Sequence, residues 1–160
     1  MLNIIIIEDE PATARNLHFS LQEIEDIGLL ATLVSVKEAV EWLRENPQTY
    51  DLVFMDIRLT DGLSFEIFQQ VKVNSPVIFV TAYDEYALQA FKTNGIDYIL
   101  KPFELAELQQ SMNKFRQLSQ PANQIMGMEQ NAATVVTKFA VGIGTLRVRV
   151  RKKSGYSTAL

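Results

Sequence analysis

Residues 2–11 read LNIIIIEDEP, an almost unbroken apolar run followed by three acidic residues and a proline. The four isoleucines Ile4–Ile7 leave no polar face, which is typical of a strand covered on both sides, as in a parallel sheet. Pro11 suits the first turn of a helix, where no backbone N–H is needed. The stretch therefore predicts a buried parallel strand, a short acidic loop and a helix.

Four further apolar runs repeat this plan along the chain. Their starts lie roughly twenty to twenty-six residues apart, about the length of a strand and its crossover helix. The runs are Gly28–Val34, Leu52–Met55, Val77–Val80 and Ile96–Leu100. The alternation predicts a doubly wound α/β domain with five helices and a five-stranded parallel sheet, flavodoxin-like with strand order 2-1-3-4-5.

Apolar residues at helical spacing mark the helices. Ser35 and Glu38 form a capping-box pattern that opens the second helix, which stops before Pro47. The fourth helix, Glu85–Lys92, is short and ends near Gly95. The expected buried stripes are Ala14, Leu17, Leu21 and Ile24 in the first helix, Ala39, Val40 and Leu43 in the second, Phe65, Phe68 and Val71 in the third, and Leu105, Leu108, Met112 and Phe115 in the fifth, Glu104–Leu118.

Charge divides the chain into two unlike parts. Residues 1–120 hold 18 acidic and 9 basic residues, a net charge of −9, whereas residues 121–160 hold one acidic and six basic residues, a net charge of +5. Residues 120–134 are polar and rich in Gln and Asn, which predicts a linker. We expect one domain over residues 1–119, this linker, and a short basic tail over residues 135–160.

Composition excludes several kinds of site. The chain has no cysteine and a single histidine, His18, so neither a disulfide scaffold nor a Cys/His zinc site can form. The N-terminal apolar run has no basic leader and ends at acidic residues, so it predicts neither a signal peptide nor a membrane span. With 48% apolar and 21% charged residues, the sequence predicts a soluble, cytoplasmic protein with no membrane role.

Polar side chains stand where the predicted strands end. Glu8 and Asp9 follow the first strand and Asp56 the third, while Thr81 and Lys101 end the fourth and fifth. Ligands of open α/β sheets bind outside the carboxyl ends of the strands, at the point where the strand order reverses. We therefore expect these five side chains to share one pocket.

The three carboxylates of this set predict a metal ion. Like charges held so close raise one another's pKa and cost stability unless a cation lies between them. Mg²⁺ prefers oxygen ligands and keeps several waters, so it suits a carboxylate cluster with one position open to a phosphate oxygen. Lys101 and Thr81 would add a positive charge and a hydroxyl donor for that phosphate.

Four segments together carry a resemblance to a known family. They are IIIIEDEP (residues 4–11), LVFMDIRLTDG (52–62), FVTAY (79–83) and DYILKPF (97–103). Gly62, at the end of the second segment, is expected to open the next helix. Over residues 1–119 the chain resembles the receiver domain of two-component response regulators. The segments EDEPATAR and YALQAFKTNGIDYILKPF look most like receivers attached to LytTR-type DNA-binding domains, of which residues 135–160 would be at most a fragment.

The resemblance implies a role for each residue of the pocket. Asp56 would take a phosphoryl group from a sensor histidine kinase, and the domain would catalyse only its own phosphorylation and dephosphorylation. The metal ligands would be Asp9 and Asp56 directly, Glu8 through water and the backbone carbonyl of Arg58, and the phosphoryl group would be held by Thr81, Ala82 and Lys101. A cis peptide is expected at Lys101–Pro102.

The resemblance also implies how the signal leaves the pocket. Thr81 and Tyr98 would form the switch, with Tyr98 facing the surface of the fourth and fifth helices and turning inward on activation. The face made by the fourth helix, fifth strand and fifth helix would then control transcription or form a homodimer, and DNA would be bound only if the full protein has a complete output domain. Arg58 and Tyr83 flank the path of the hydrolytic water, and the bulk of Tyr83 predicts slow dephosphorylation.

Three alternative functions remain open from the sequence. A phosphorylation-independent dimerisation or interaction module would have the same fold. A flavodoxin-like FMN-binding electron carrier would need a phosphate-cradling loop after the first strand, where EDEP would repel the phosphate. A phosphatase with an aspartyl nucleophile would normally have a second aspartate two residues beyond the first, where this chain has Arg58.

Overall fold

The computed structural model of the chain describes residues 1–119, so the expected linker and basic tail lie outside the described residues. Five parallel strands form one sheet in the order β2-β1-β3-β6-β7. The strands are β1 (Leu2–Ile7), β2 (Ile27–Leu33), β3 (Leu52–Met55), β6 (Val77–Thr81) and β7 (Gly95–Leu100). The predicted doubly wound order is confirmed.

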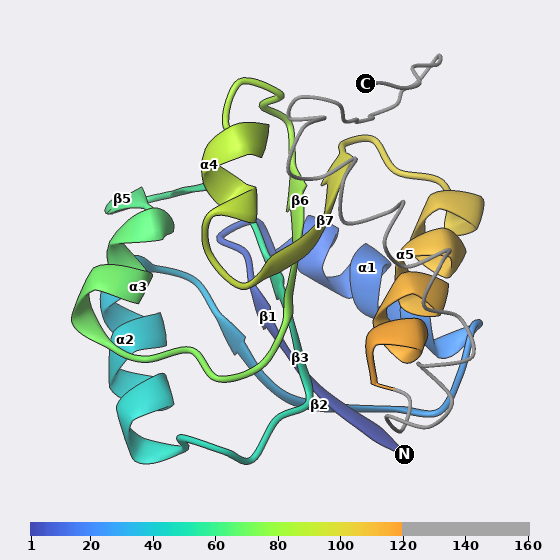
Figure 1. Cartoon of the computed structure of the whole chain (residues 1–160), viewed down its shortest axis with the longest axis horizontal. Helices are drawn as coiled ribbons and strands as arrows, with labels where there is room; N and C mark the ends of the chain where they lie inside the picture. The colour runs from blue at the N-terminus through green and yellow to red at the C-terminus, as the bar shows by residue number, and fades with distance from the viewer. Residues whose placement is uncertain (120–160) are drawn as a thin grey trace. The chain divides into compact units, whose positions relative to one another are not determined.

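Helices cover both faces of this sheet (Figure 1). They are α1 (Pro11–Gln22), α2 (Val36–Glu45), α3 (Phe65–Gln70), α4 (Ala87–Phe91) and α5 (Leu105–Leu118). The buried residues of α1 and α5 form one hydrophobic cluster with one face of the strands, and those of α2, α3 and α4 form a second cluster with the other face. The site-bearing strand ends are thus fixed between two packed layers.

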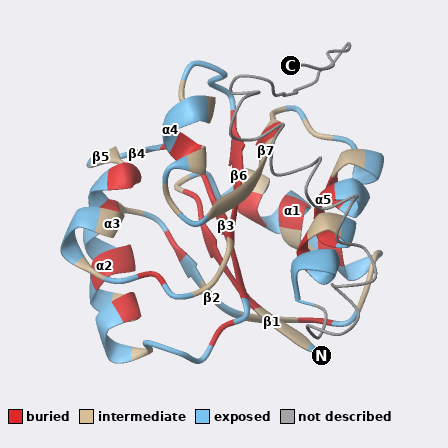
Figure 2. Ribbon diagram, in the orientation of Figure 1, coloured by how far each residue is buried: buried red, intermediate tan, exposed pale blue. Residues whose placement is uncertain are grey.

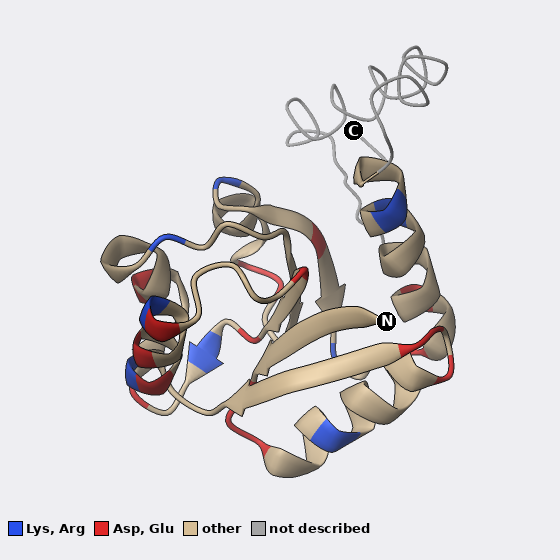
Figure 3. Ribbon diagram, turned by 90° about the horizontal axis from the view of Figure 1, so that it is seen from below, with Lys and Arg blue, Asp and Glu red and all other residues tan. Residues whose placement is uncertain are grey.

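Burial is concentrated in the central strands β1, β3 and β6 (Figure 2). All four residues of β3 and all five of β6 are buried, as are Ile4–Ile7 in β1. Charged residues lie mainly on the helices and loops (Figure 3). A strand buried on both faces cannot alternate polar and apolar residues, which explains the continuous apolar runs of the sequence. Within residues 1–119 no helix has the length and apolar character needed to cross a membrane.

The start of α2 follows the predicted capping pattern. The Ser35 hydroxyl accepts a hydrogen bond of 3.0 Å from the backbone N–H of Glu38. The Glu38 carboxylate reaches back to the N–H of Val34, at 2.8 Å, one residue before the cap. Side chains thereby satisfy backbone donors that have no partner inside the helix.

The segment between β3 and α3 differs from the prediction. It forms a small antiparallel hairpin of β4 (Arg58–Leu59) and β5 (Gly62–Leu63). Gly62 was expected to open the next helix, but it lies in β5 with a φ of 149°, a backbone conformation that favours glycine. The helix α3 begins only at Phe65.

Four helix predictions were wrong at the ends of their elements. Ile24 lies beyond the end of α1 and packs against the core from the following turn, and Val71 is the C-cap of α3. Leu105 begins α5 but is exposed. The helix α4 is shorter than predicted, and Gly95 begins β7. Apolar character alone does not fix where a helix ends, because capping and tertiary packing decide the last turn.

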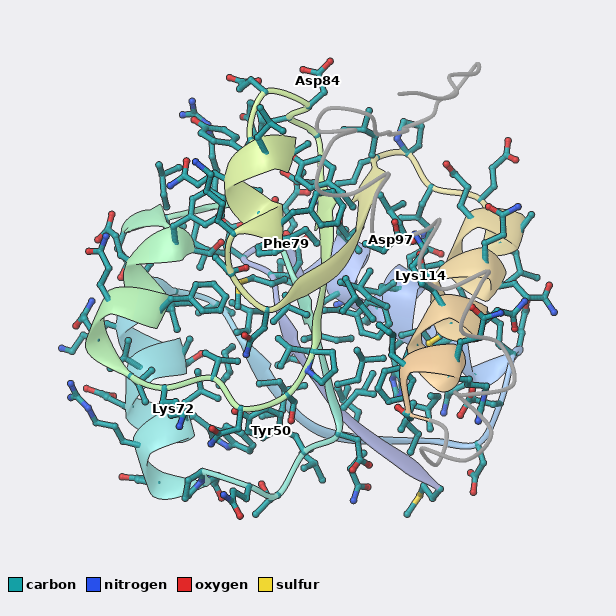
Figure 4. The ribbon with its side chains drawn as sticks, in the orientation of Figure 1. Tyr50, Lys72, Phe79, Asp84, Asp97 and Lys114 are labelled. Atoms are coloured by element: carbon teal, nitrogen blue, oxygen red, sulfur yellow. The ribbon has the colours of Figure 1, made fainter. Side chains whose placement is uncertain are left out.

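Polar contacts fasten α5 to the edge strand β7. The Lys114 ammonium lies 3.2 Å from the Asp97 carboxylate, and the two side chains lie next to each other in Figure 4. The buried Ser111 hydroxyl also donates a hydrogen bond to Asp97. These contacts hold α5 beside the strand that delivers Lys101 to the site.

Candidate functional site

The carboxyl ends of four strands bring the predicted polar residues together. Glu8 and Asp9 follow β1, and Asp56 follows β3, which is paired with β1 in register Ile7 with Met55. The carboxylate oxygens that these three residues offer lie within 4.8 Å of one another. Glu8 is 3% exposed and Asp56 7%, whereas Asp9 is half-buried. The site is therefore a compact acidic cluster with its more open side at Asp9.

Lys101 contacts two of the three carboxylates of this acidic cluster. Its ammonium nitrogen is 2.7 Å from Glu8 Oε1 and 2.9 Å from Asp56 Oδ2, and both contacts are hydrogen-bonded ion pairs. The Lys101 backbone N–H also donates to the Thr81 carbonyl, at 2.8 Å. The Lys101–Pro102 peptide that follows is cis, as expected. The pairing of Lys101 with Glu8 was not predicted from the sequence.

Burial and charge shift the pKa values of two members of the cluster. Burial raises the pKa of the Glu8 carboxyl, and the nearby Asp56 charge adds to this, although hydrogen bonds from Lys101 and the Glu10 N–H oppose it. Burial alone would lower the pKa of Lys101, but its hydrogen bonds to Glu8 and Asp56 outweigh burial and raise it. Lys101 is thus held as a cation between two carboxylates.

The second oxygen of Asp56 and the hydroxyl of Thr81 complete the site. Asp56 Oδ1 accepts a hydrogen bond of 2.7 Å from the Ile57 N–H, so both carboxylate oxygens have a fixed position. Thr81 is fully buried, and its hydroxyl oxygen has no hydrogen-bond partner among the described residues. Buried polar groups nearly always have a partner, so this hydroxyl is a donor available to a ligand. Ala82, the next residue, is exposed.

The residues present fit a magnesium ion. Three carboxylates converge on one point, and Lys101 contacts two of them, so the cluster carries more negative than positive charge. A hard divalent cation with oxygen ligands would remove this excess. The ion pairs of Lys101 are with Glu8 and Asp56 and not with Asp9. Asp9 is also partly exposed, which leaves room for the waters that Mg²⁺ retains.

Tyr98 lies outside this cluster, in β7, where it is paired with Phe79 of β6. Its half-buried ring packs against Phe79, with 6.3 Å between the ring centroids, beside the hydrophobic cluster on the face covered by α2, α3 and α4. Its hydroxyl donates a hydrogen bond to the Tyr83 carbonyl, and burial raises its pKa. Tyr98 packs against the hydrophobic cluster that contains α4, whereas the buried residues of α5 belong to the cluster on the other face of the sheet. Its inward turn on activation stays a prediction.

Arg58, Tyr83 and Tyr86 form a cluster at the rim of the site, which we call the rim cluster. The Arg58 guanidinium lies 4.6 Å from the centre of the Tyr83 ring and donates a hydrogen bond of 3.0 Å to the Tyr86 hydroxyl. The two tyrosine rings meet edge to face, with 6.4 Å between their centroids. Sequence analysis did not single out Tyr86, because its contact with Arg58 spans 28 residues. The rim cluster links β4, which follows Asp56, to the N-cap residue of α4.

Comparisons with known proteins identify the family. The family model of the response regulator receiver domain matches residues 4–113. The sensory transduction protein LytR of Staphylococcus haemolyticus is 36% identical over 137 residues, which is 84% of this chain and 53% of that protein. The transcriptional regulatory protein LytR of Staphylococcus aureus is 39% identical over 118 residues, 72% of this chain and 47% of that protein. The chain thus spans about half the length of these curated relatives.

Solved structures with the same fold are also receiver domains. The response regulatory domain of protein mrkE from Klebsiella pneumoniae superposes with a TM-score of 0.61 at 26% identity, covering 74% of this chain and 95% of that one. The non-phosphorylated HemR receiver domain from Leptospira biflexa gives 0.60 at 25% identity, covering 76% and 98%. The match over residues 4–113, the identity to LytR proteins and the shared fold show that this chain belongs to the response regulator receiver domain family.

Proposed function

We propose that this domain accepts a phosphoryl group on Asp56 from a phosphohistidine of a sensor histidine kinase in the cytoplasm. The observation that supports it best is the environment of Asp56: its carboxylate is nearly buried, and both oxygens are held, by Lys101 at 2.9 Å and by the Ile57 N–H at 2.7 Å. A fixed carboxylate beside a cation is suited to nucleophilic attack on phosphorus, because orientation and charge are set before the donor arrives.

The transfer makes one bond and breaks another. An Asp56 oxygen attacks phosphorus, a phosphorus–oxygen bond forms, and the phosphorus–nitrogen bond to the donor imidazole breaks, its electron pair staying on nitrogen. Lys101 then neutralises part of the charge on the transferred group. A bound Mg²⁺ would supply further charge neutralisation, held by Asp9, Asp56 and the Arg58 carbonyl, with Glu8 contributing through water.

The phosphorylated state would be read by Thr81, Ala82 and Lys101. The Thr81 hydroxyl has no other partner among residues 1–119, and the Ala82 N–H follows it at the exposed end of β6. Movement of Thr81 toward the phosphoryl oxygen would change the packing around Phe79 and Tyr98, which lie on the neighbouring strands β6 and β7. Such a coupling typically amounts to about 1–3 kcal/mol, enough to shift populations but not to refold the domain.

The output surface would be the face of α4, β7 and α5. Leu88 on α4 and Leu105 on α5 are 55% and 41% exposed, and an interface on this face would cover these apolar side chains. We propose that phosphorylation promotes a homodimer through this face and thereby controls transcription. DNA binding would require a complete output domain in the full protein.

The test of this function is a phosphorylation assay that identifies the modified residue. Incubation with acetyl phosphate and Mg²⁺ is expected to add a single phosphate to the intact mass, and EDTA is expected to prevent the gain. Borohydride reduces an acyl phosphate to the alcohol, so peptide mapping should find homoserine at position 56. No mass gain, or reduction at Glu8 or Asp9 instead, would contradict the proposal and favour the phosphorylation-independent module.

We further propose that Tyr83 shields the aspartyl phosphate from water. Its ring lies under the Arg58 guanidinium at the rim of the site, two residues beyond Thr81. Tyr83→Ala is expected to speed loss of the phosphoryl group severalfold, measured by intact mass after removal of donor. Tyr83→Phe keeps the ring and the contact with Arg58, so it should decay at the wild-type rate. Equal rates in wild type and Tyr83→Ala would refute the shielding role.

A further inference from the structure

The β4–β5 hairpin is fixed at its tip to a distant helix. The hairpin begins two residues after Asp56, and its two-residue loop is Thr60–Asp61. The Asp61 carboxylate reaches the start of α2, where Oδ1 accepts a hydrogen bond of 2.7 Å from the Val36 N–H and Oδ2 one of 3.0 Å from the Lys37 N–H. One carboxylate thus joins the tip of the hairpin to two residues that lie 25 and 24 positions earlier in the chain. We call this pair of hydrogen bonds the clasp.

The charge of Asp61 is matched to this position. Burial alone would raise the pKa of Asp61, but the hydrogen bonds from the Val36 and Lys37 N–H groups together outweigh burial and lower it. The amino end of a helix also carries partial positive charge, so an ionised carboxylate is favoured there. The clasp therefore remains charged and intact at neutral pH, even though the residue is exposed.

The clasp acts on the backbone that follows Asp56. In the hairpin Arg58 pairs with Leu63, and the Ser64 N–H donates to the Ile57 carbonyl at 2.7 Å. The segment clasped by Asp61 is also bonded to the acidic loop, since the Glu8 N–H donates to the Leu33 carbonyl at 2.9 Å. The loop after Asp56 and the loop after β1 are therefore held by one shared segment, the junction of β2 and α2.

We infer that Asp61 is a positioning residue for the metal site, because its clasp on α2 holds the hairpin that presents the Arg58 carbonyl. This inference rests on the proposed function, in which that carbonyl is a ligand of Mg²⁺. Among the hydrogen bonds of residues 1–119, those of the Asp61 carboxylate go to the start of α2 and not to the carboxylate cluster or Lys101. It acts through the hairpin backbone alone.

The competing explanation is that Asp61 only caps α2. Ser35 provides the matched control, because its hydroxyl caps the same helix through the Glu38 N–H and has no bond to the hairpin. Loss of either cap should lower the thermal midpoint by about 4 °C. Only loss of Asp61 should also release the hairpin.

The experiment is Mg²⁺ titration of the whole chain by calorimetry for wild type, Asp61→Ala, Asp61→Asn and Ser35→Ala. We expect Asp61→Ala to bind Mg²⁺ about tenfold more weakly, as is typical when support of a ligand is lost. Asp61→Asn keeps one acceptor oxygen and should fall between wild type and Asp61→Ala. Ser35→Ala should bind with wild-type affinity despite its lower midpoint.

The outcomes separate this inference from the function on which it rests. Equal affinities in wild type and Asp61→Ala, or an equal loss in Ser35→Ala, would overturn the positioning role while leaving the metal site in place. A wild type that does not bind Mg²⁺ would remove both. Hydrogen exchange of residues 58–63 gives a second readout: exchange should accelerate in Asp61→Ala and not in Ser35→Ala, and unchanged exchange in Asp61→Ala would also count against the clasp.

Discussion

Asp56→Asn is expected to abolish phosphorylation completely while the domain stays folded. The carboxamide lacks the nucleophilic carboxylate, so no phosphorus–oxygen bond can form at position 56. The fold should tolerate the change, because the Asn carbonyl oxygen can still accept the hydrogen bond from the Ile57 N–H and Lys101 keeps its contact with Glu8. Intact mass after incubation with acetyl phosphate and Mg²⁺ measures the result.

A matched control shows whether this loss is specific. Asp51→Asn replaces another aspartate near β3, an exposed one that accepts a hydrogen bond from the Asn3 N–H, and it should be phosphorylated like wild type. A phosphate gain in Asp56→Asn would show that another residue is the acceptor.

The Asp56→Asn variant also reports on the metal site. Mg²⁺ that binds only the folded state stabilises it by about 2.7 kcal/mol at a concentration about 100 times Kd. In Asp56→Asn this increment should be small, since one carboxylate of the cluster is gone. Thermal unfolding with and without Mg²⁺ measures the difference.

Lys101→Met is expected to destabilise the metal-free domain by about 3 kcal/mol at pH 8, the low end for breaking a buried ion pair. Methionine has a similar length but no charge, so Glu8 and Asp56 would face each other without their cation. Both carboxylates are more than nine-tenths buried, so water cannot replace the ammonium fully. Urea unfolding of wild type and variant in EDTA measures the difference in free energy.

The pH dependence of this loss follows from the raised pKa of Glu8. A carboxyl whose pKa is higher in the fold stabilises it at pH values below the unfolded pKa, and this contribution is lost as pH rises through the folded pKa. Without Lys101 the pKa of Glu8 should rise further, so the variant loses more stability than wild type between acidic and neutral pH. The pKa of Lys101 is raised in the fold above its ordinary value of 10.5. In wild type the ion pairs of Lys101 therefore persist throughout this pH range and are lost only as the pH rises through the raised pKa. The difference between wild type and Lys101→Met should therefore shrink from pH 8 to pH 5.

Two further variants check the cause. Glu8→Gln combined with Lys101→Met removes one of the unpaired charges and should recover part of the stability. Lys114→Met breaks the ion pair with Asp97 at a more exposed position and should cost less than about 1 kcal/mol. A cost for Lys101→Met as small as that for Lys114→Met, or one independent of pH, would show that the buried ion pairs are not the source.

The sequence predicted those parts of the molecule that depend on local pattern. Ile4–Ile7 and Leu52–Met55 are strands because continuous apolar runs can be satisfied only by burial on both faces. The Ser35 cap was predicted because its partner Glu38 lies three residues away. Sequence reasoning placed Leu105 in a buried stripe, and this was wrong because burial depends on what packs against a helix as well as on its periodicity.

The sequence alone determined the doubly wound arrangement of the sheet, the acidic loop after β1 and the places of Asp56, Thr81 and Lys101 at strand ends. These residues could be assigned to one site because the carboxyl ends of parallel strands lie at the same edge of the sheet. Only the tertiary structure decided that Lys101 bonds Glu8 as well as Asp56, that Arg58 reaches Tyr86, and that Asp61 clasps α2. These contacts join residues 24 to 93 positions apart, so they depend on the register of strands and the direction of side chains. No local sequence pattern specifies these contacts, because the side chains come together only when helices pack on both faces of the sheet.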